Sequence, residues 1–176
     1  MCHQADRDVA QLLESTGAFL TNRPIVDPTL SLAPAETLTL DIPAELQYVN
    51  TLSACICAFL TNIEQLAEPE TTLYNLELAI QEISVNIATH AYANARGRIR
   101  MVALLSYQPL RITITLHDTG VSFNPDTVLQ PRLGELQEHG YGLFLVTHLM
   151  DEVVYQQTDS GNVWTLIKNL PSIMNS

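Results

Sequence analysis

Residues 75–90 combine apolar and polar positions in a pattern that predicts an unusual helix. The segment contains no Gly or Pro, and we placed it on a wheel of about 100° per residue. Two apolar stripes result, formed by Leu76, Ile80, Ile83 and Ile87 and by Leu78 and Val85. One polar strip is expected to face solvent and comprises Glu77, Gln81 and Ser84, whereas a second lies between the apolar stripes and comprises Asn75, Glu82, Asn86 and Thr89. A one-sided surface helix has a single polar face, so the second strip needs an explanation.

Glu82 and Asn86 are the polar pair that this pattern singles out. They are four residues apart, so their side chains are neighbours on a helix. A carboxylate and a carboxamide between apolar walls are costly unless something pairs with them. A metal ion, a water molecule or a ligand could be that partner. Alternatively, Asn86 hydrogen-bonds a neighbouring loop and Glu82 extends to water, and the helix alone does not decide between these interpretations.

The remaining periodicity predicts the element order β-α-α-β-β-loop-α-β-β. Strands are expected at 37–42, 98–107, 110–117, 153–157 and 163–168, and helices at 44–67, from Thr71 or Thr72 as a cap to about 93, and at 140–150. Hairpin strands with helices to cover them indicate an α+β fold, a two-layer sandwich whose mixed, mostly antiparallel sheet has helices on one face. Residues 1–35 are Pro-rich toward their end and are interpreted as an N-terminal extension or linker, which leaves 36–171 as one domain.

Composition narrows the function classes. The net charge is −11 with only 8 Lys and Arg, which argues against nucleic-acid binding and suits a partner with a basic surface. Three cysteines without a metal-ligand spacing favour a reducing, cytoplasmic compartment. Neither a signal peptide nor a membrane span is expected.

Asp118 is the main candidate for ligand recognition in the second half of the chain. It ends a predicted strand, Gly120 allows a close backbone approach, and Phe123 adds apolar area two residues after Val121. An ionised carboxylate only accepts hydrogen bonds, so in an apolar pocket it would select an exocyclic amine such as that of adenine. The competing interpretation is an ordinary Asp-x-Gly turn.

Gly140 and Gly142 flank Tyr141 at the start of a predicted apolar helix. Free N–H groups at a helix N-terminus favour phosphates, although glycines there could equally serve tight packing. Residues 124–139, between this motif and Phe123, are expected to form a flexible lid.

These motifs together resemble one family. Glu82-x-x-x-Asn86, Asp118-x-Gly120-x-x-Phe123 and Gly140-x-Gly142, in this order, are similar to the N, G1 and G2 boxes of the Bergerat-fold (GHKL) ATPases. Residues 82–92 and 142–153 resemble the anti-sigma-factor serine/threonine kinases of bacterial partner-switching systems. The resemblance covers about 37–170.

The resemblance implies roles for individual residues. Asn86 would bind Mg²⁺, Glu82 would accept the proton of an attacking serine hydroxyl, and Asp118 would bind the adenine amine of ATP. The nucleotide-binding residues implied are Asn86, Asp118, Gly120, Val121, Phe123, Gly140, Tyr141, Gly142, Leu143 and Thr165. The partners implied are a sigma factor and an anti-anti-sigma (STAS) protein, with a homodimer typical of the family.

Some positions depart from the family pattern. Glu138 and His139 precede the second glycine box where Arg or Ser is frequent, and Asn162 stands where many relatives have a Thr that helps to hold adenine. A nucleotide-gated, partner-sequestering module with little or no kinase activity is therefore the alternative hypothesis. A histidine-kinase-type domain or a gyrase-like ATPase fits less well, because no phosphoacceptor helix or transducer domain is recognised. His90, His117 and His148 are interpreted as packing residues and Trp164 as core.

Overall fold

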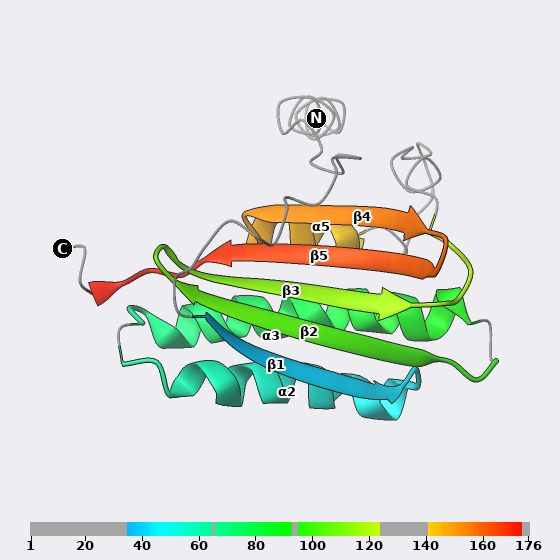
Figure 1. The fold of residues 1–176 in the computed structure, drawn as a ribbon, viewed down its shortest axis with the longest axis horizontal. Coiled ribbons are helices and arrows are strands. Elements are labelled where there is room, and N and C mark those ends of the chain that lie inside the picture. Colours follow the sequence, from blue (N-terminus) through cyan, green and yellow to red (C-terminus); the bar gives the residue numbers. More distant parts are fainter. Residues whose placement is uncertain (1–34, 65, 93–94, 124–140, 174–176) are drawn as a thin grey trace, which may run out of the picture.

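The computed structural model describes residues 35–64, 66–92, 95–123 and 141–173. Within them the predicted order of elements is confirmed (Figure 1). The elements are β1 (Ala35–Pro43), α2 (Leu46–Thr61), α3 (Pro69–Asn86), η1 (Ile87–Ala91), β2 (Arg98–Tyr107), β3 (Leu110–Asp118), α5 (Tyr141–Leu149), β4 (Glu152–Thr158) and β5 (Gly161–Asn169).

The strands form one sheet in the order β1-β2-β3-β5-β4. All four pairings between these strands are antiparallel, so the parallel component expected for a mixed sheet is not found among the described strands. Helices α2, α3 and α5 lie together behind the sheet in Figure 1, which confirms the two-layer α+β sandwich. The expected extension (1–35) and lid (124–139) lie outside the described residues, apart from Ala35.

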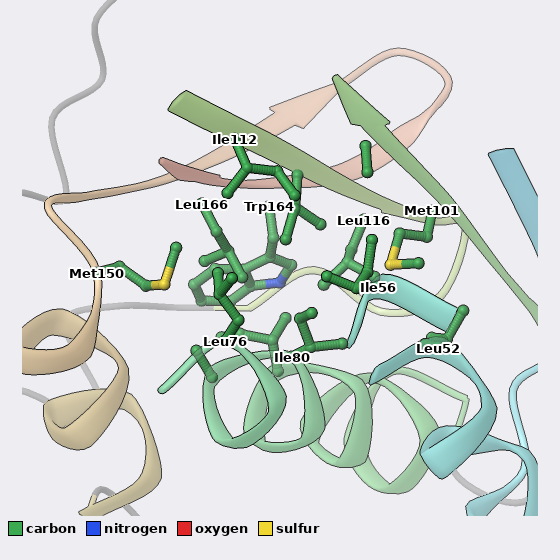
Figure 2. Close-up of a cluster of buried hydrophobic side chains, with 14 of the residues drawn as sticks. Leu52, Ile56, Leu76, Ile80, Met101, Ile112, Leu116, Met150, Trp164 and Leu166 are labelled. Carbon is green, nitrogen blue, oxygen red and sulfur yellow. The ribbon is translucent and has the colours of Figure 1, made fainter. Parts of the chain in front are cut away.

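The core lies between the sheet and the helices. Alternate residues of β3, which are Ile112, Ile114 and Leu116, are fully buried, as period-two alternation predicts. Figure 2 shows Ile112 and Leu116 on the side of the sheet that faces Leu76 and Ile80 of α3. Burial of each such side chain stabilises the fold by roughly 1.5–3 kcal/mol relative to exposure, so this layer fixes α3 against the sheet.

The start of α3 differs from the prediction. The helix begins at Pro69, and its N-cap is Glu68 with φ 48°, without a side-chain capping bond. A proline at the first helical position is preorganised for the helix and lacks an N–H that would be unpaired there. The helix therefore begins before Thr71, and the capping role predicted for Thr71 or Thr72 was wrong, since both lie inside the helix and Thr72 is buried.

The polar strip of α3 that was expected to face solvent is partly an interhelical contact. Ser84 is fully buried, and Gln81 Nε2 donates to Ser53 Oγ of α2 at 3.4 Å. Small side chains such as serine allow two helices to pack closely, so polarity alone gave the wrong exposure here. Of the other strip, Asn75, Glu82 and Asn86 are half-buried, whereas Thr89 is exposed, and so is Val85 of the apolar stripe beside it. The prediction of a polar strip between two apolar walls is therefore only partly met.

No helix in the described ranges is both long and apolar enough to cross a membrane.

Candidate functional site

The junction of α3 and η1 places the first two candidate residues. Asn86 is the last residue of α3, and Ile87–Ala91 continues as one π-helical turn. Single π-turns of this kind occur frequently at functional sites. Ile83 and Ile87 anchor this end of the helix in the core, so Glu82 and Asn86 project half-buried from its edge, one turn apart.

The beginning of α5 lies against Glu82. A Cβ placed on Gly142 would collide with the Oε2 atom of Glu82, so the glycine permits this contact. Leu143 and Val146 are buried and attach α5 to the core. The structure thus brings Glu82, Gly142 and Leu143 together, whereas Gly140 and the Tyr141 side chain lie outside what is described.

Asp118 ends β3 and is only 5% exposed. Its Oδ1 atom accepts two hydrogen bonds, from the Gly120 N–H at 2.9 Å and from Asn162 Nδ2 at 2.9 Å. The loop that follows is held against η1, since Val121 N donates to the Ala91 carbonyl at 2.6 Å and a Cβ on Gly120 would collide with that oxygen. Gly120 therefore allows the backbone of η1 to approach closely, whereas the close approach of a ligand at this residue stays a prediction.

Tyr92 ties the same loop to the sheet. Its hydroxyl accepts a hydrogen bond from the Thr119 N–H at 2.8 Å and donates to the Arg98 carbonyl at 3.0 Å. A Cβ on Gly97 would collide with the Tyr92 ring. The loop that carries Asp118 is consequently positioned by a residue 27 positions earlier in the chain.

Three aromatic rings pack beside Asp118. Phe123 lies 5.2 Å from Trp164 and 5.5 Å from Tyr155, measured between ring centroids, and Tyr155 and Trp164 are 4.7 Å apart. The Tyr155 hydroxyl accepts the Phe123 N–H at 2.7 Å and donates to Asn162 Oδ1 at 2.9 Å. Trp164 is core as expected (Figure 2). Phe123 packs on Tyr155 and Trp164 and Val121 is 72% exposed, and the contribution of these two residues to a ligand pocket stays a prediction.

Thr165 is not brought to the other candidates. It pairs with Thr115, three residues before Asp118, while Asn162 pairs with Asp118 itself. Side chains alternate between the two faces of a sheet, so Thr165 faces away from Asp118 and Asn162 faces the same side as Asp118. The sequence indicated Asn162 only as a departure from a family pattern, and it gave no comparable signal for Tyr155.

His117, next to Asp118, has a shifted pKa. Burial lowers the pKa of His117, the Arg100 guanidinium lowers it further, and Asp118 opposes both.

A metal ion would find few protein ligands here. No group of three or more His, Cys, Asp or Glu suited to a metal ion exists among the described residues. Mg²⁺ keeps several waters and usually binds through one or two carboxylates together with substrate phosphates; the half-buried Asn86 carboxamide offers a single oxygen of the hard type that Mg²⁺ takes.

The comparison with protein families decides the identity of this fold. The histidine kinase-like ATPase domain matches residues 42–168. The chain belongs to this family. The predicted membership of the GHKL superfamily is thereby confirmed, and the match spans α3, the Asp118 loop, α5 and the Asn162 strand.

Similar proteins point to one branch of the histidine kinase-like ATPases. The chain is 33% identical over 127 residues to the serine-protein kinase RsbW of Bacillus mycoides, covering 67% of this chain and 76% of that protein. It is 32% identical over 127 residues, with the same coverage, to RsbW of Bacillus cereus. The crystal structure of the RsbU and RsbW domains of a Mycobacterium tuberculosis protein shares the fold, with TM-score 0.56, 20% identity, and coverage of 77% of this chain and 32% of that chain.

Proposed function

We propose that this histidine kinase-like ATPase domain is an ATP-dependent serine/threonine-protein kinase and anti-sigma factor of a bacterial partner-switching system. It would bind a sigma factor and phosphorylate a serine of an anti-anti-sigma (STAS) protein. The observation that carries the proposal is the placement of Glu82 one helical turn before Asn86 and directly against Gly142 at the start of α5. The similarity to serine-protein kinases RsbW supports it.

Asp118 is the proposed adenine-binding group. Its Oδ1 atom already accepts hydrogen bonds from Gly120 and Asn162. The described residues donate none to Oδ2, so this oxygen can accept a hydrogen from an exocyclic amine. A purine with a carbonyl at the same position would place its oxygen, an acceptor, against the Oδ2 acceptor of Asp118, and this repulsion disfavours its binding.

Asn86 is the proposed protein ligand of Mg²⁺. The ion, when bound, would neutralise charge on the nucleotide phosphates. The phosphates themselves would lie near the start of α5, where Gly142 presents backbone without a side chain and where helix N–H groups favour anions. Of the residues implied by the family resemblance, those not described here, Gly140 among them, stay predictions.

Glu82 is the proposed general base. Phosphoryl transfer depends mainly on positioning and charge neutralisation, with a carboxylate that accepts the substrate hydroxyl proton. Glu82 is half-buried and is held between α3 and α5, so its carboxylate is positioned before substrate arrives. General-base catalysis contributes typically about 10²–10⁴-fold.

Incubation with labelled ATP, Mg²⁺ and a cognate STAS protein tests the proposal. The wild-type protein should transfer phosphate to a serine, and Glu82→Gln should lower the rate by about 100-fold or more while ADP affinity changes little. Glu77→Gln is the matched control, because Glu77 is an exposed glutamate on the same helix. Absence of transfer by folded, ADP-binding protein would contradict the kinase activity.

A nucleotide-gated module that sequesters its partner is the second candidate. It is favoured by the sequence of 124–140, which carries a single cation, Arg132, and places Glu138 close to the second glycine box. In that case ATP would change partner affinity without transfer, and Glu82→Gln would leave both partner binding and nucleotide affinity unchanged.

A further inference from the structure

A chain of hydrogen bonds runs from the backbone of Phe123 to the carboxylate of Asp118. The Phe123 N–H donates to the Tyr155 hydroxyl at 2.7 Å, and that hydroxyl donates to Asn162 Oδ1 at 2.9 Å. Asn162 Nδ2 then donates to Asp118 Oδ1 at 2.9 Å and to the Gly120 carbonyl at 3.1 Å. The chain thus joins the loop over 118–123 to the β4–β5 hairpin, which lies more than 30 residues later in the sequence.

The polarity of this chain is set at its backbone end. A peptide N–H can only donate, so the Tyr155 oxygen must accept from Phe123 and direct its own proton elsewhere. That proton goes to Asn162 Oδ1, which therefore fixes the orientation of an amide whose two ends are otherwise interchangeable. The amide NH₂ group is left to face the Asp118 carboxylate and the Gly120 carbonyl.

Burial makes the orientation costly to reverse. Asn162 is 2% exposed and Asp118 5% exposed, so water has little access to replace a lost hydrogen bond. An Asn162 amide turned by 180° would place its oxygen against the Asp118 carboxylate and its NH₂ against the Tyr155 hydroxyl. Two acceptors in contact in a buried site repel, and each unpaired polar group costs about 1–3 kcal/mol.

We propose that Tyr155 and Asn162 are positioning residues that set the purine selectivity of this site. They hold the Asp118 carboxylate so that Oδ1 is occupied and only Oδ2 is available to accept a hydrogen bond from a ligand. With Oδ1 bonded to Asn162 and Gly120, only Oδ2 remains to accept from a ligand, and it selects a purine that carries an exocyclic amine. This inference rests on the proposed function, because it takes Asp118 as the adenine-binding group.

The test compares ADP with purine riboside diphosphate, which lacks the exocyclic amine, and with inosine diphosphate, which carries a carbonyl there. Calorimetry on the full chain should show that the wild-type protein prefers ADP to both. Tyr155→Phe should weaken ADP binding by about fivefold to tenfold and change binding of purine riboside diphosphate by less than about twofold. A purely structural role for Tyr155 would instead weaken both ligands equally.

Tyr107→Phe is the matched control. The Tyr107 hydroxyl donates to Glu36 at 2.8 Å at the opposite end of the β2–β3 hairpin, so its removal should leave the selectivity ratio unchanged. Melting curves of both variants verify that the fold is retained.

Asn162→Asp provides a second, isosteric variant. It places two carboxylates in contact, and such a pair shares a proton because both cannot ionise easily. While that proton is bound, the introduced carboxyl group can still donate to Asp118, so ADP affinity relative to wild type should fall as pH rises and the proton is lost. Asn162→Thr, which offers Asp118 a hydroxyl donor that does not titrate in this range, should retain part of the wild-type selectivity at all pH values.

The outcomes are distinct. Two results together would overturn this inference without contradicting the proposed function. Tyr155→Phe would bind ADP with the wild-type ratio of affinities for ADP and purine riboside diphosphate, and the ADP affinity of Asn162→Asp relative to wild type would not change with pH. A folded wild-type protein without affinity for ADP would overturn both. A loss of affinity in Tyr155→Phe that affects ADP but not purine riboside diphosphate would support the inference, whether or not phosphate transfer is observed.

Discussion

Asp118 keeps its carboxylate buried with neutral hydrogen-bond donors. The donors are a backbone N–H and the Asn162 amide, and hydrogen bonds to a charged group are worth roughly 1.5–3 kcal/mol each. The local motif around Asp118 is visible in sequence, and so is the four-residue spacing of Glu82 and Asn86. Asn162 and Tyr92 were not predicted as site residues, because their contacts with the Asp118 loop span 44 and 27 residues and exist only after the sheet has formed.

Replacement of Asp118 by Asn tests the recognition of the amine. The amide can present an NH₂ group where the carboxylate presents only oxygen, so ADP affinity should fall by about tenfold or more. Calorimetry measures the change. Asp159→Asn, in the exposed β4–β5 turn, should bind ADP as wild type does. If wild type, Asp118→Asn and Asp159→Asn bound ADP equally well, the proposed role of Asp118 in binding adenine would be wrong.

Tyr92→Phe should loosen the loop that carries Asp118. The variant removes the acceptor of the Thr119 N–H and the donor to the Arg98 carbonyl, so it should lower the free energy of unfolding by about 1–2 kcal/mol. Urea titration measures this change. Tyr74→Phe, at a tyrosine that is 63% exposed, should change it by less than about 0.5 kcal/mol, and an equal effect of the two substitutions would contradict the assigned role.

The contact of Gly142 with Glu82 predicts a coupled pair. Gly142→Ala alone should destabilise the protein by about 1–3 kcal/mol, because the new methyl group collides with the carboxylate. In a Glu82→Ala background the same change should be neutral or stabilise by up to about 1 kcal/mol, since alanine favours a helix over glycine. A double-mutant cycle with urea unfolding measures the coupling, and additive effects would show that the two residues do not interact.

At the scale of elements, the periodicity located each strand to within two residues and the two longer helices less closely. The predicted start of α3 was too late, because Thr71 or Thr72 was taken as the N-cap. The helix begins instead at Pro69. The exposure of Ser84 was also predicted wrongly, since the wheel of one helix does not show where α2 packs. Periodicity reports which faces differ, but the neighbouring element decides which polar face is covered.

The turn between α5 and β4 depends on Asp151. Its carboxylate accepts from Lys168 Nζ at 3.0 Å and from the Asn169 N–H at 2.7 Å. Burial alone would raise the pKa of Asp151, but these two partners outweigh it and hold the pKa below its ordinary value. Because the folded-state pKa is depressed, the stabilisation is present above the unfolded pKa of about 3.9 and is lost as pH falls through the folded value.

Asp151→Asn should therefore lower the free energy of unfolding at pH 7 and have little effect in strong acid. We expect a loss of about 0.5–1 kcal/mol at neutral pH, modest because the Asp151 side chain is 37% exposed and solvent screens the ion pair. Urea titrations at about pH 7 and about pH 3 measure the difference. The exposed neighbour Glu152 offers the control Glu152→Gln, and an equal loss at both pH values would contradict the linkage argument.

For the whole molecule, the proposed site would join parts of the chain that are distant in sequence. Glu82 and Asn86 come from α3, Asp118 from β3, Gly142 from α5 and Asn162 from β5. These elements also bury the shared core between sheet and helices. A ligand that contacts all of them would bind only the assembled fold, so its binding free energy adds to the stability of the entire domain.

Thermal unfolding with and without nucleotide measures this linkage. A ligand at about 100 times its dissociation constant stabilises the native state by about 2.7 kcal/mol. For a domain of this size, each kcal/mol raises Tm by roughly 2–4 °C, so ADP with Mg²⁺ should raise it by roughly 5–11 °C. Asn86→Ala should reduce the part of the shift that depends on Mg²⁺, and Asp118→Asn should reduce the shift with and without the ion. If saturating ADP left the Tm unchanged, the proposed site would be excluded, because a ligand that binds only the folded protein must stabilise it.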